Sequence, residues 1–190
     1  MKMRKNYSVL MRIWHWLNAI VVIGLLGTFF LRKTFLSWKT NAALITEKLG
    51  AYGIDVTEKQ AAAIARAIRA PMWEWHIILG VALGILLLVR VWILWSEKGF
   101  GYEENGSLHT RLVHWGYKAL YLVLVFMAVS GVMIHWDDTL GVSHAIVESL
   151  EGIHESVAWA VVYFVPLHIL GVVVAEHRGQ KNLTSKMISG

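Results

Sequence analysis

The sequence predicts an all-α integral membrane protein, a four-helix bundle that forms a single domain over residues 1–190. Three observations support this fold class. Hydrophobic residues make up 56% of the chain and charged residues only 16%, whereas about a quarter of an ordinary soluble domain is charged. The apolar residues gather in four long runs, and tryptophans mark the ends of these runs. Much of the protein surface is therefore expected to face lipid.

Each of the four apolar runs is long enough to cross a membrane as a helix, because a hydrocarbon core of about 30 Å needs about 20 helical residues. The runs cover approximately residues 13–31, 73–95, 112–134 and 153–175. The first run is longer than the apolar core of a signal peptide and has no small-residue cleavage site after it, so we expect a retained helix. Trp16, Trp95 and Trp115 are placed as anchors at the lipid headgroups.

The connection between the first two spans, residues 32–72, is the longest and is predicted to contain a helix. Thr57 and Gln60 form the capping-box pattern T-x-x-Q that opens a helix. Pro71 is expected to end it, because the residue before a proline is disfavoured in helical geometry. The simplest role is a helix on the membrane surface, and the alternative is a lid or docking surface.

The distribution of lysine and arginine around the spans predicts the orientation of the chain. An even number of spans places both termini on one side, and the count of basic residues favours the cytoplasm for that side. Residues 32–72 would then form a helical outer loop. The net charge of +5 is explained by this topology, so no nucleic-acid partner is expected.

The absence of cysteine restricts the redox chemistry that the chain can support. Without cysteine there are no disulfides, iron–sulfur clusters, thiolate zinc sites or covalent c-type haem. The nine histidines are the remaining candidates for holding a redox cofactor.

Four of the histidines, His15, His76, His154 and His168, lie in the predicted spans near an end or at a useful depth, where an ionisable residue is costly and indicates function. His154 and His168 are fourteen residues apart, which corresponds to about 3.9 turns and about 21 Å of helix. Both therefore lie on one face, one near each side of the bilayer. Two haems stacked through a bundle require such a shared helix. At matching depths, His15 would complete the inner iron with His168, and His76 the outer iron with His154.

Basic residues near the inner ends of the spans are candidates for binding haem propionates, since a guanidinium group can donate two parallel hydrogen bonds to one carboxylate. Arg12 precedes His15 by three residues, Arg90 is embedded in an apolar run, and Arg111 begins the third span. Each could instead be a snorkelling interface residue, and Arg90 is the strongest candidate. His114 could bond a propionate, relay a proton to a quinone, replace one of the ligands, or simply lie at the polar boundary.

The residues around these histidines resemble the prokaryotic cytochrome b561 family, which belongs with the b-type subunits of nickel–iron hydrogenases and formate dehydrogenases. The resemblance covers nearly the whole chain. It rests on Arg12-Ile-Trp-His15-Trp in the first span, Trp75-His76 with Gly80 in the second, Arg111-Leu-Val-His114-Trp in the third, and His154-Glu155 followed by Pro166-Leu167-His168 in the fourth.

The resemblance implies two bis-histidine b haems, ligated by His15, His76, His154 and His168, and electron exchange with the membrane quinone pool. We therefore expect a multi-pass protein of the bacterial inner membrane that passes electrons between quinone or quinol and a periplasmic partner, such as a cytochrome c or an enzyme subunit. A second copy of the chain is a further candidate partner. The long outer loop departs from the compact members of the family.

Three alternatives remain open from the sequence. The first is an enzyme, a superoxide oxidase that reduces ubiquinone. The second is a membrane-anchor cytochrome b subunit of a hydrogenase- or dehydrogenase-type complex. The third is a haem-free transporter or structural membrane protein whose histidines lie at the interface by chance.

Overall fold

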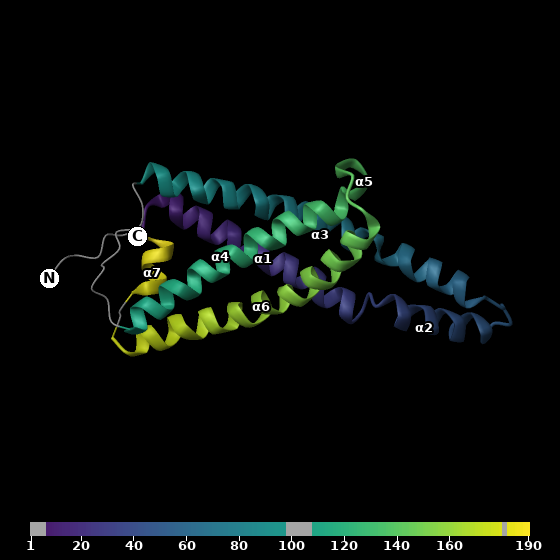
Figure 1. The fold of residues 1–190 in the computed structure, drawn as a ribbon. Helices are drawn as coiled ribbons and strands as arrows, with labels where there is room; N and C mark the ends of the chain where they lie inside the picture. The colour runs from purple at the N-terminus through teal and green to yellow at the C-terminus, as the bar shows by residue number, and fades with distance from the viewer. Residues whose placement is uncertain (1–6, 98–107, 180–181) are drawn as a thin grey trace. The chain divides into compact units, whose positions relative to one another are not determined.

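The computed structural model describes residues 7–97, 108–179 and 182–190, and the regular structure of these residues is helical (Figure 1). By their internal contacts the residues divide into two compact units, Met1–Ala19 with Val81–Gly190 and Ile20–Gly80, and each is described by itself. The helices are α1 (Val9–Lys33), α2 (Trp38–Gly50), α3 (Glu58–Ser96), α4 (Leu108–His135), α5 (Asp137–Leu140), α6 (His144–His177) and α7 (Leu183–Ile188).

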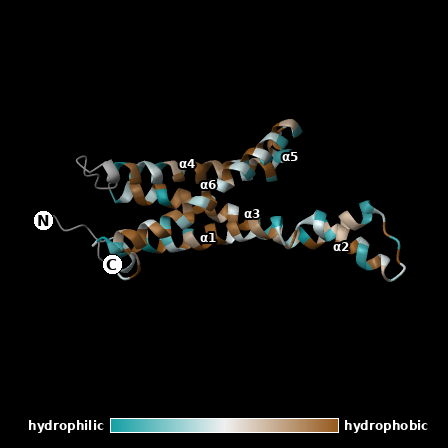
Figure 2. Ribbon diagram, turned by 90° about the horizontal axis from the view of Figure 1, so that it is seen from below, coloured by the Kyte–Doolittle hydropathy of each residue, from teal (hydrophilic) through white to brown (hydrophobic). Residues whose placement is uncertain are grey.

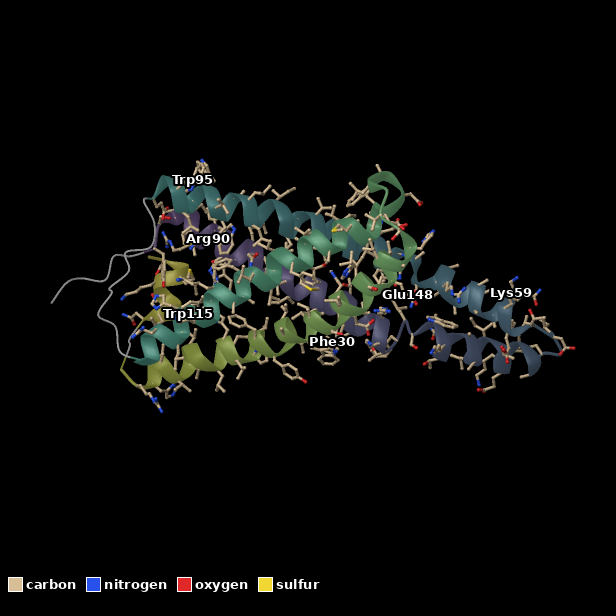
Figure 3. All side chains as sticks on the ribbon, viewed as in Figure 1. Phe30, Lys59, Arg90, Trp95, Trp115 and Glu148 are labelled. Carbon is tan, nitrogen blue, oxygen red and sulfur yellow. The ribbon has the colours of Figure 1, made fainter. Side chains whose placement is uncertain are left out.

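Among the described residues, four helices are long and apolar enough to cross a membrane, as the sequence predicts. They are α1, α3, α6 and the Arg111–His135 part of α4, and each contains one of the four predicted runs. Figure 2 shows the hydrophobic residues that dominate these helices. The protein is therefore an all-α, multi-pass membrane protein. Trp95 and Trp115, labelled in Figure 3, are 83% and 64% exposed, which suits side chains that contact headgroups.

Helix α3 is longer than the sequence predicts. The capping box is confirmed: the Thr57 amide donates to Gln60 Oε1 over 2.9 Å, and the Gln60 amide donates to Thr57 Oγ1 over 3.3 Å. Pro71, however, lies inside the helix, so the expectation that it ends the helix was wrong. A proline removes one backbone hydrogen bond and can kink a helix without ending it, and the alanines around it favour helix strongly. The loop helix and the second span are therefore one element.

The first half of the 32–72 segment is also helical, which the sequence analysis did not anticipate. Helix α2 is rich in alanine, leucine, lysine and glutamate, which are good helix formers. Within the Ile20–Gly80 unit, the guanidinium of Arg66 on α3 lies over the ring of Trp38 on α2, 4.8 Å from its centre. Ala61 and Ala65 of α3 are fully buried.

In the larger unit, α4 and α6 pack along one another (Figures 1 and 2). A small apolar core lies beside them, where Met11 and Trp14 of α1 meet Ile93 of α3, and Tyr121 of α4 packs against this core. At the start of α1, the Trp16 indole donates to the carbonyl of Met187 over 3.0 Å. The short helix α7 therefore lies against the first turns of α1.

Candidate functional site

His15 on α1 and His168 on α6 lie beside one another within the larger unit. Their ring centres are 6.4 Å apart and their planes are inclined by 53°. A metal–nitrogen bond of about 2 Å, with about 1 Å more to each ring centre, places two imidazoles that share one metal about 6 Å apart. The observed separation would allow both imidazoles to bind one metal ion.

The surroundings of this pair are mainly aromatic. The His168 ring stacks on Phe164 with 5.8 Å between centres and 8° between planes, and the Tyr117 hydroxyl lies 3.4 Å from His168 Nδ1. The His15 ring meets Trp16 edge to face at 5.3 Å. His15 Nδ1 is buried and has no hydrogen-bond partner among the described residues. These two rings are thus oriented chiefly by packing.

His154 lies on the same continuous helix as His168, and its orientation is set by a serine. Ser130 Oγ on α4 is 2.8 Å from His154 Nδ1, and it also donates to the Phe126 carbonyl over 2.6 Å. A hydroxyl has one hydrogen, so while Ser130 donates it to the Phe126 carbonyl, its oxygen accepts from the Nδ1–H of His154. That tautomer leaves the lone pair on Nε2, the form in which a neutral imidazole binds a metal.

His76 on α3, in the Ile20–Gly80 unit, has the same arrangement with a threonine. Thr28 Oγ1 on α1 lies 2.8 Å from His76 Nδ1 and donates to the Leu25 carbonyl over 2.7 Å. By the same count of hydrogens, Thr28 accepts from Nδ1–H, which places the lone pair of the His76 ring on Nε2. Thr28 is 7% exposed, so water does not compete strongly for this contact.

The sequence of the chain fits one protein-family model across almost its whole length. That model describes prokaryotic cytochrome b561, and it matches residues 6–190. The chain belongs to the prokaryotic cytochrome b561 family. Membership confirms the resemblance found in the sequence and implies haem-based electron transfer across a membrane. No curated protein and no solved structure gives a match.

The site residues of this cytochrome b561 chain fit a b-type haem. His15 and His168 present two imidazoles whose ring centres are 6.4 Å apart, and a histidine imidazole is a common ligand of haem iron. The Nδ1 atoms of His76 and His154 are held by neighbouring hydroxyls, as the ring nitrogen opposite a metal usually is in a metal-binding histidine.

Sequence reasoning missed Thr28 and Ser130. Both side chains bond a carbonyl of the preceding turn, which serine and threonine commonly do in any apolar helix. The sequence therefore gives no sign that these two hydroxyls also accept from histidines on other helices. A hydroxyl facing a histidine becomes visible only when the helix rotations are known.

Arg90, the strongest propionate candidate, is a buried cation in this cytochrome b561 chain (Figure 3). It is 4% exposed, and its guanidinium lies 5.2 Å from the centre of the Trp14 ring and 5.9 Å from that of Tyr121. Its Nε donates to the Tyr121 hydroxyl over 3.1 Å. The Trp14 indole in turn donates to the Leu86 carbonyl over 2.6 Å. A buried charge within a span indicates a functional position.

The other candidates are placed less centrally. Arg12 Nη1 donates to the carbonyl of Ile188 over 3.1 Å, so this arginine binds the carboxyl end of α7, where a cation is favoured. Arg111 is exposed in the first turns of α4, and His114 is half-buried one turn later. The Arg111 side chain makes no hydrogen bond or ion pair with the residues that the structure describes.

Proposed function

We propose that the protein carries electrons across a bacterial inner membrane, through two b-type haems, between the quinone pool and a periplasmic redox partner. The proposal depends mainly on the 6.4 Å separation of the His15 and His168 rings. His15 and His168 would hold one haem, and His76 and His154 the other. Each bound haem supplies reversible one-electron chemistry at its iron.

Helix α6 gives the proposed sites their spacing. It carries both His154 and His168, and fourteen residues of helix span about 21 Å. A single helix therefore fixes the separation of two ligand positions along the bundle. With both termini in the cytoplasm, His15 and His168 would serve the inner side, and His76 and His154 the outer side.

The exposed surface of the spans supports a quinone as the membrane-side reactant. Large apolar side chains are exposed along all four spanning helices, including Ile20, Leu88, Leu122 and Leu167. A quinone dissolves in lipid and can reach such a surface from the bilayer. His114, half-buried near the start of α4, is the side chain we propose to bind a quinone oxygen.

The helical segment 38–70 supports a protein partner on the proposed outer side. Lys39 and Lys59 are exposed on α2 and α3 respectively, and Lys48 is exposed beside Glu47. Basic side chains on an exposed surface favour a partner with an acidic face, chiefly by raising the rate of encounter. We therefore propose that α2 and the first turns of α3 form the docking surface for the periplasmic partner.

The decisive experiment is a pyridine haemochrome assay on the purified protein, followed by electron transfer in vesicles. We expect about two b haems per chain, reduced by quinol in the bilayer and reoxidised by an acceptor that cannot cross it. A preparation with no Soret band would refute the proposal. Haems that quinol leaves oxidised but superoxide reduces in stopped-flow mixing would favour the superoxide oxidase instead.

A further inference from the structure

Within the Ile20–Gly80 unit, Trp73 lies between His76 and two arginines. The rings of Trp73 and His76 meet edge to face, 5.5 Å between centres and 82° between planes. The guanidinium of Arg32, from α1, lies 5.5 Å from the Trp73 ring centre, and that of Arg69, from α3, lies 5.7 Å from it. Two cations from different helices therefore gather on one indole, next to a proposed haem ligand.

This arrangement favours the binding of an anion. Two guanidinium groups near one ring repel each other, and the ring quadrupole offsets only part of that repulsion. Arg69 Nε is buried and has no hydrogen-bond partner among the described residues. A buried charged donor without an acceptor is costly, and guanidinium donors match the oxygens of a carboxylate or phosphate in pairs.

We propose that Arg32 and Arg69 bind the propionate carboxylates of the haem whose iron His76 would ligate. This inference rests on the proposed function. Arg69 precedes His76 by seven residues, which is about two turns and about 10 Å on the same helix face. Arg32 follows Thr28, the hydroxyl partner of His76, by four residues, which places it one turn further along the same face of α1.

The positions of the two arginines fit a propionate better than a lipid phosphate. Both are displaced from His76 in the same direction, toward the ends of α1 and α3 that are nearest to α2 in the sequence. The carboxylates of a haem extend from one edge of the macrocycle, so they reach one side of the iron only. Trp73 contacts His76 and both arginines. Its apolar ring therefore separates the proposed iron ligand from Arg32 and Arg69, which together form the proposed carboxylate clamp.

Arg66 offers a matched control. It lies three residues before Arg69 on α3 and has the same charge, but it is exposed and stacks on Trp38 instead of Trp73. Arg66→Gln and Arg69→Gln therefore change the net charge equally, within one turn of the same helix. A difference between them reports the contact at Trp73 and not the charge of the segment.

The test is spectroelectrochemical titration of the haem-loaded protein, with haem content, in neutral detergent without phosphate. We expect Arg69→Gln to lower the midpoint potential of one of the two haem components, because a nearby cation disfavours the ferric state. It should also speed the loss of one haem to apomyoglobin, while Arg66→Gln leaves both properties unchanged. Arg32→Gln should shift the same component, and the double variant should shift it by less than the sum of the two.

Several outcomes would overturn the clamp. Equal shifts in Arg66→Gln and Arg69→Gln would leave only a general charge effect. An Arg69→Gln effect that requires vesicles containing phosphatidylglycerol would assign the site to lipid phosphate. If Arg69→Gln does not fold, Arg69→Lys decides, because it keeps the charge but cannot donate paired hydrogen bonds to a carboxylate: haem loss as slow as in the wild type would refute the clamp. A wild-type protein without haem would instead refute the proposed function.

Discussion

The His15–His168 pair and the two other span histidines, His76 and His154, are oriented in different ways. The first two rings lie among Phe164, Tyr117 and Trp16, with a hydrogen bond as long as 3.4 Å at His168. His76 and His154 each have Nδ1 held by a hydroxyl at 2.8 Å. Packing fixes the first pair, and a hydrogen bond of defined direction fixes each of the others.

This difference has an electronic consequence for a bound iron. An acceptor on Nδ1–H raises the basicity of the opposite nitrogen, and a more basic ligand stabilises the ferric state. Thr28 and Ser130 therefore contribute toward a lower potential at the haem proposed for His76 and His154. Among the described residues, the Nδ1 atoms of His15 and His168 have no such acceptor apart from the Tyr117 hydroxyl, 3.4 Å from His168 Nδ1.

The largest effect should come from removing a ligand. His15→Ala or His168→Ala should remove one haem, and His76→Ala or His154→Ala should remove the other, so haem per chain falls to about half in each case. The remaining Soret band should be the same within a pair and different between pairs. Identical remaining spectra in all four variants would show that the pairing is wrong.

Substitution of the buried Arg90, which lies in the same unit as His15 and His168, should give the next largest effect. Arg90→Gln removes a charged hydrogen bond to Tyr121 and stacking on Trp14, which together should cost about 2–3 kcal/mol. Thermal unfolding in detergent measures this loss. Arg90→Lys should not restore stability, because an ammonium group is not planar, cannot stack on the Trp14 ring and cannot donate paired hydrogen bonds. Full recovery by lysine would indicate that the charge alone matters.

The hydroxyls offer the most direct way to test the comparison itself. Ser130→Ala should leave His154 Nδ1–H without its acceptor, at a cost of about 1–3 kcal/mol, and should raise the midpoint potential of one haem component. Thr28→Val should do the same at His76 with little change in volume. Thr28→Ser keeps the hydroxyl and should leave the midpoint potential as in the wild type. The electron paramagnetic resonance signal of the same haem should move in Ser130→Ala and Thr28→Val.

If both haem components shifted equally in Thr28→Val, the effect would be a general loosening of the bundle. A shift confined to the component lost in His76→Ala supports orientation of that ligand by the threonine. The conservative serine variant separates the two explanations, because a methyl group lost from a packed site costs packing and not hydrogen bonding.

The sequence was sufficient to predict the four apolar helices and the histidine spacing on α6. Apolar runs and residue intervals are local properties of a chain, so they can be recognised without knowledge of the tertiary contacts. Pro71 shows where local rules fail: the preference against helix before proline was outweighed by the helix-forming residues on both sides. Helix α2 was missed because its mixed polar sequence shows no strong apolar period.

The orienting residues could not be predicted because they depend on how the helices are rotated. Thr28 and Ser130 are unremarkable hydroxyls in apolar runs until His76 and His154 lie opposite them. The cations at Trp73 are also separated in sequence, with Arg32 at the end of α1 and Arg69 within α3. In contrast, Arg12 looked well placed beside His15 on spacing alone, yet its side chain binds the end of α7.

The smallest effect should come from the helix contact near Thr28. A Cβ added at Gly24 would lie 2.9 Å from Leu79 Cδ1, while one added at Gly27 would meet nothing within 4 Å. Gly24→Ala should therefore cost about 1 kcal/mol through overpacking, and Gly27→Ala should be neutral or slightly stabilising, as alanine is in a helix interior. Thermal unfolding of the two variants in one detergent makes the comparison.

Gly24 is one turn from Thr28, so the same variant probes the hydroxyl contact indirectly. If the added methyl displaces α1 from α3 at Leu79, the Thr28–His76 distance should lengthen, and the haem component affected by Thr28→Val should shift in the same direction but less. Adding Leu79→Ala to Gly24→Ala should reverse that shift, although the smaller side chain costs packing of its own. A stability loss without any spectral shift would show that the threonine tolerates movement of the helix, and that the hydrogen bond does not depend on this packing contact.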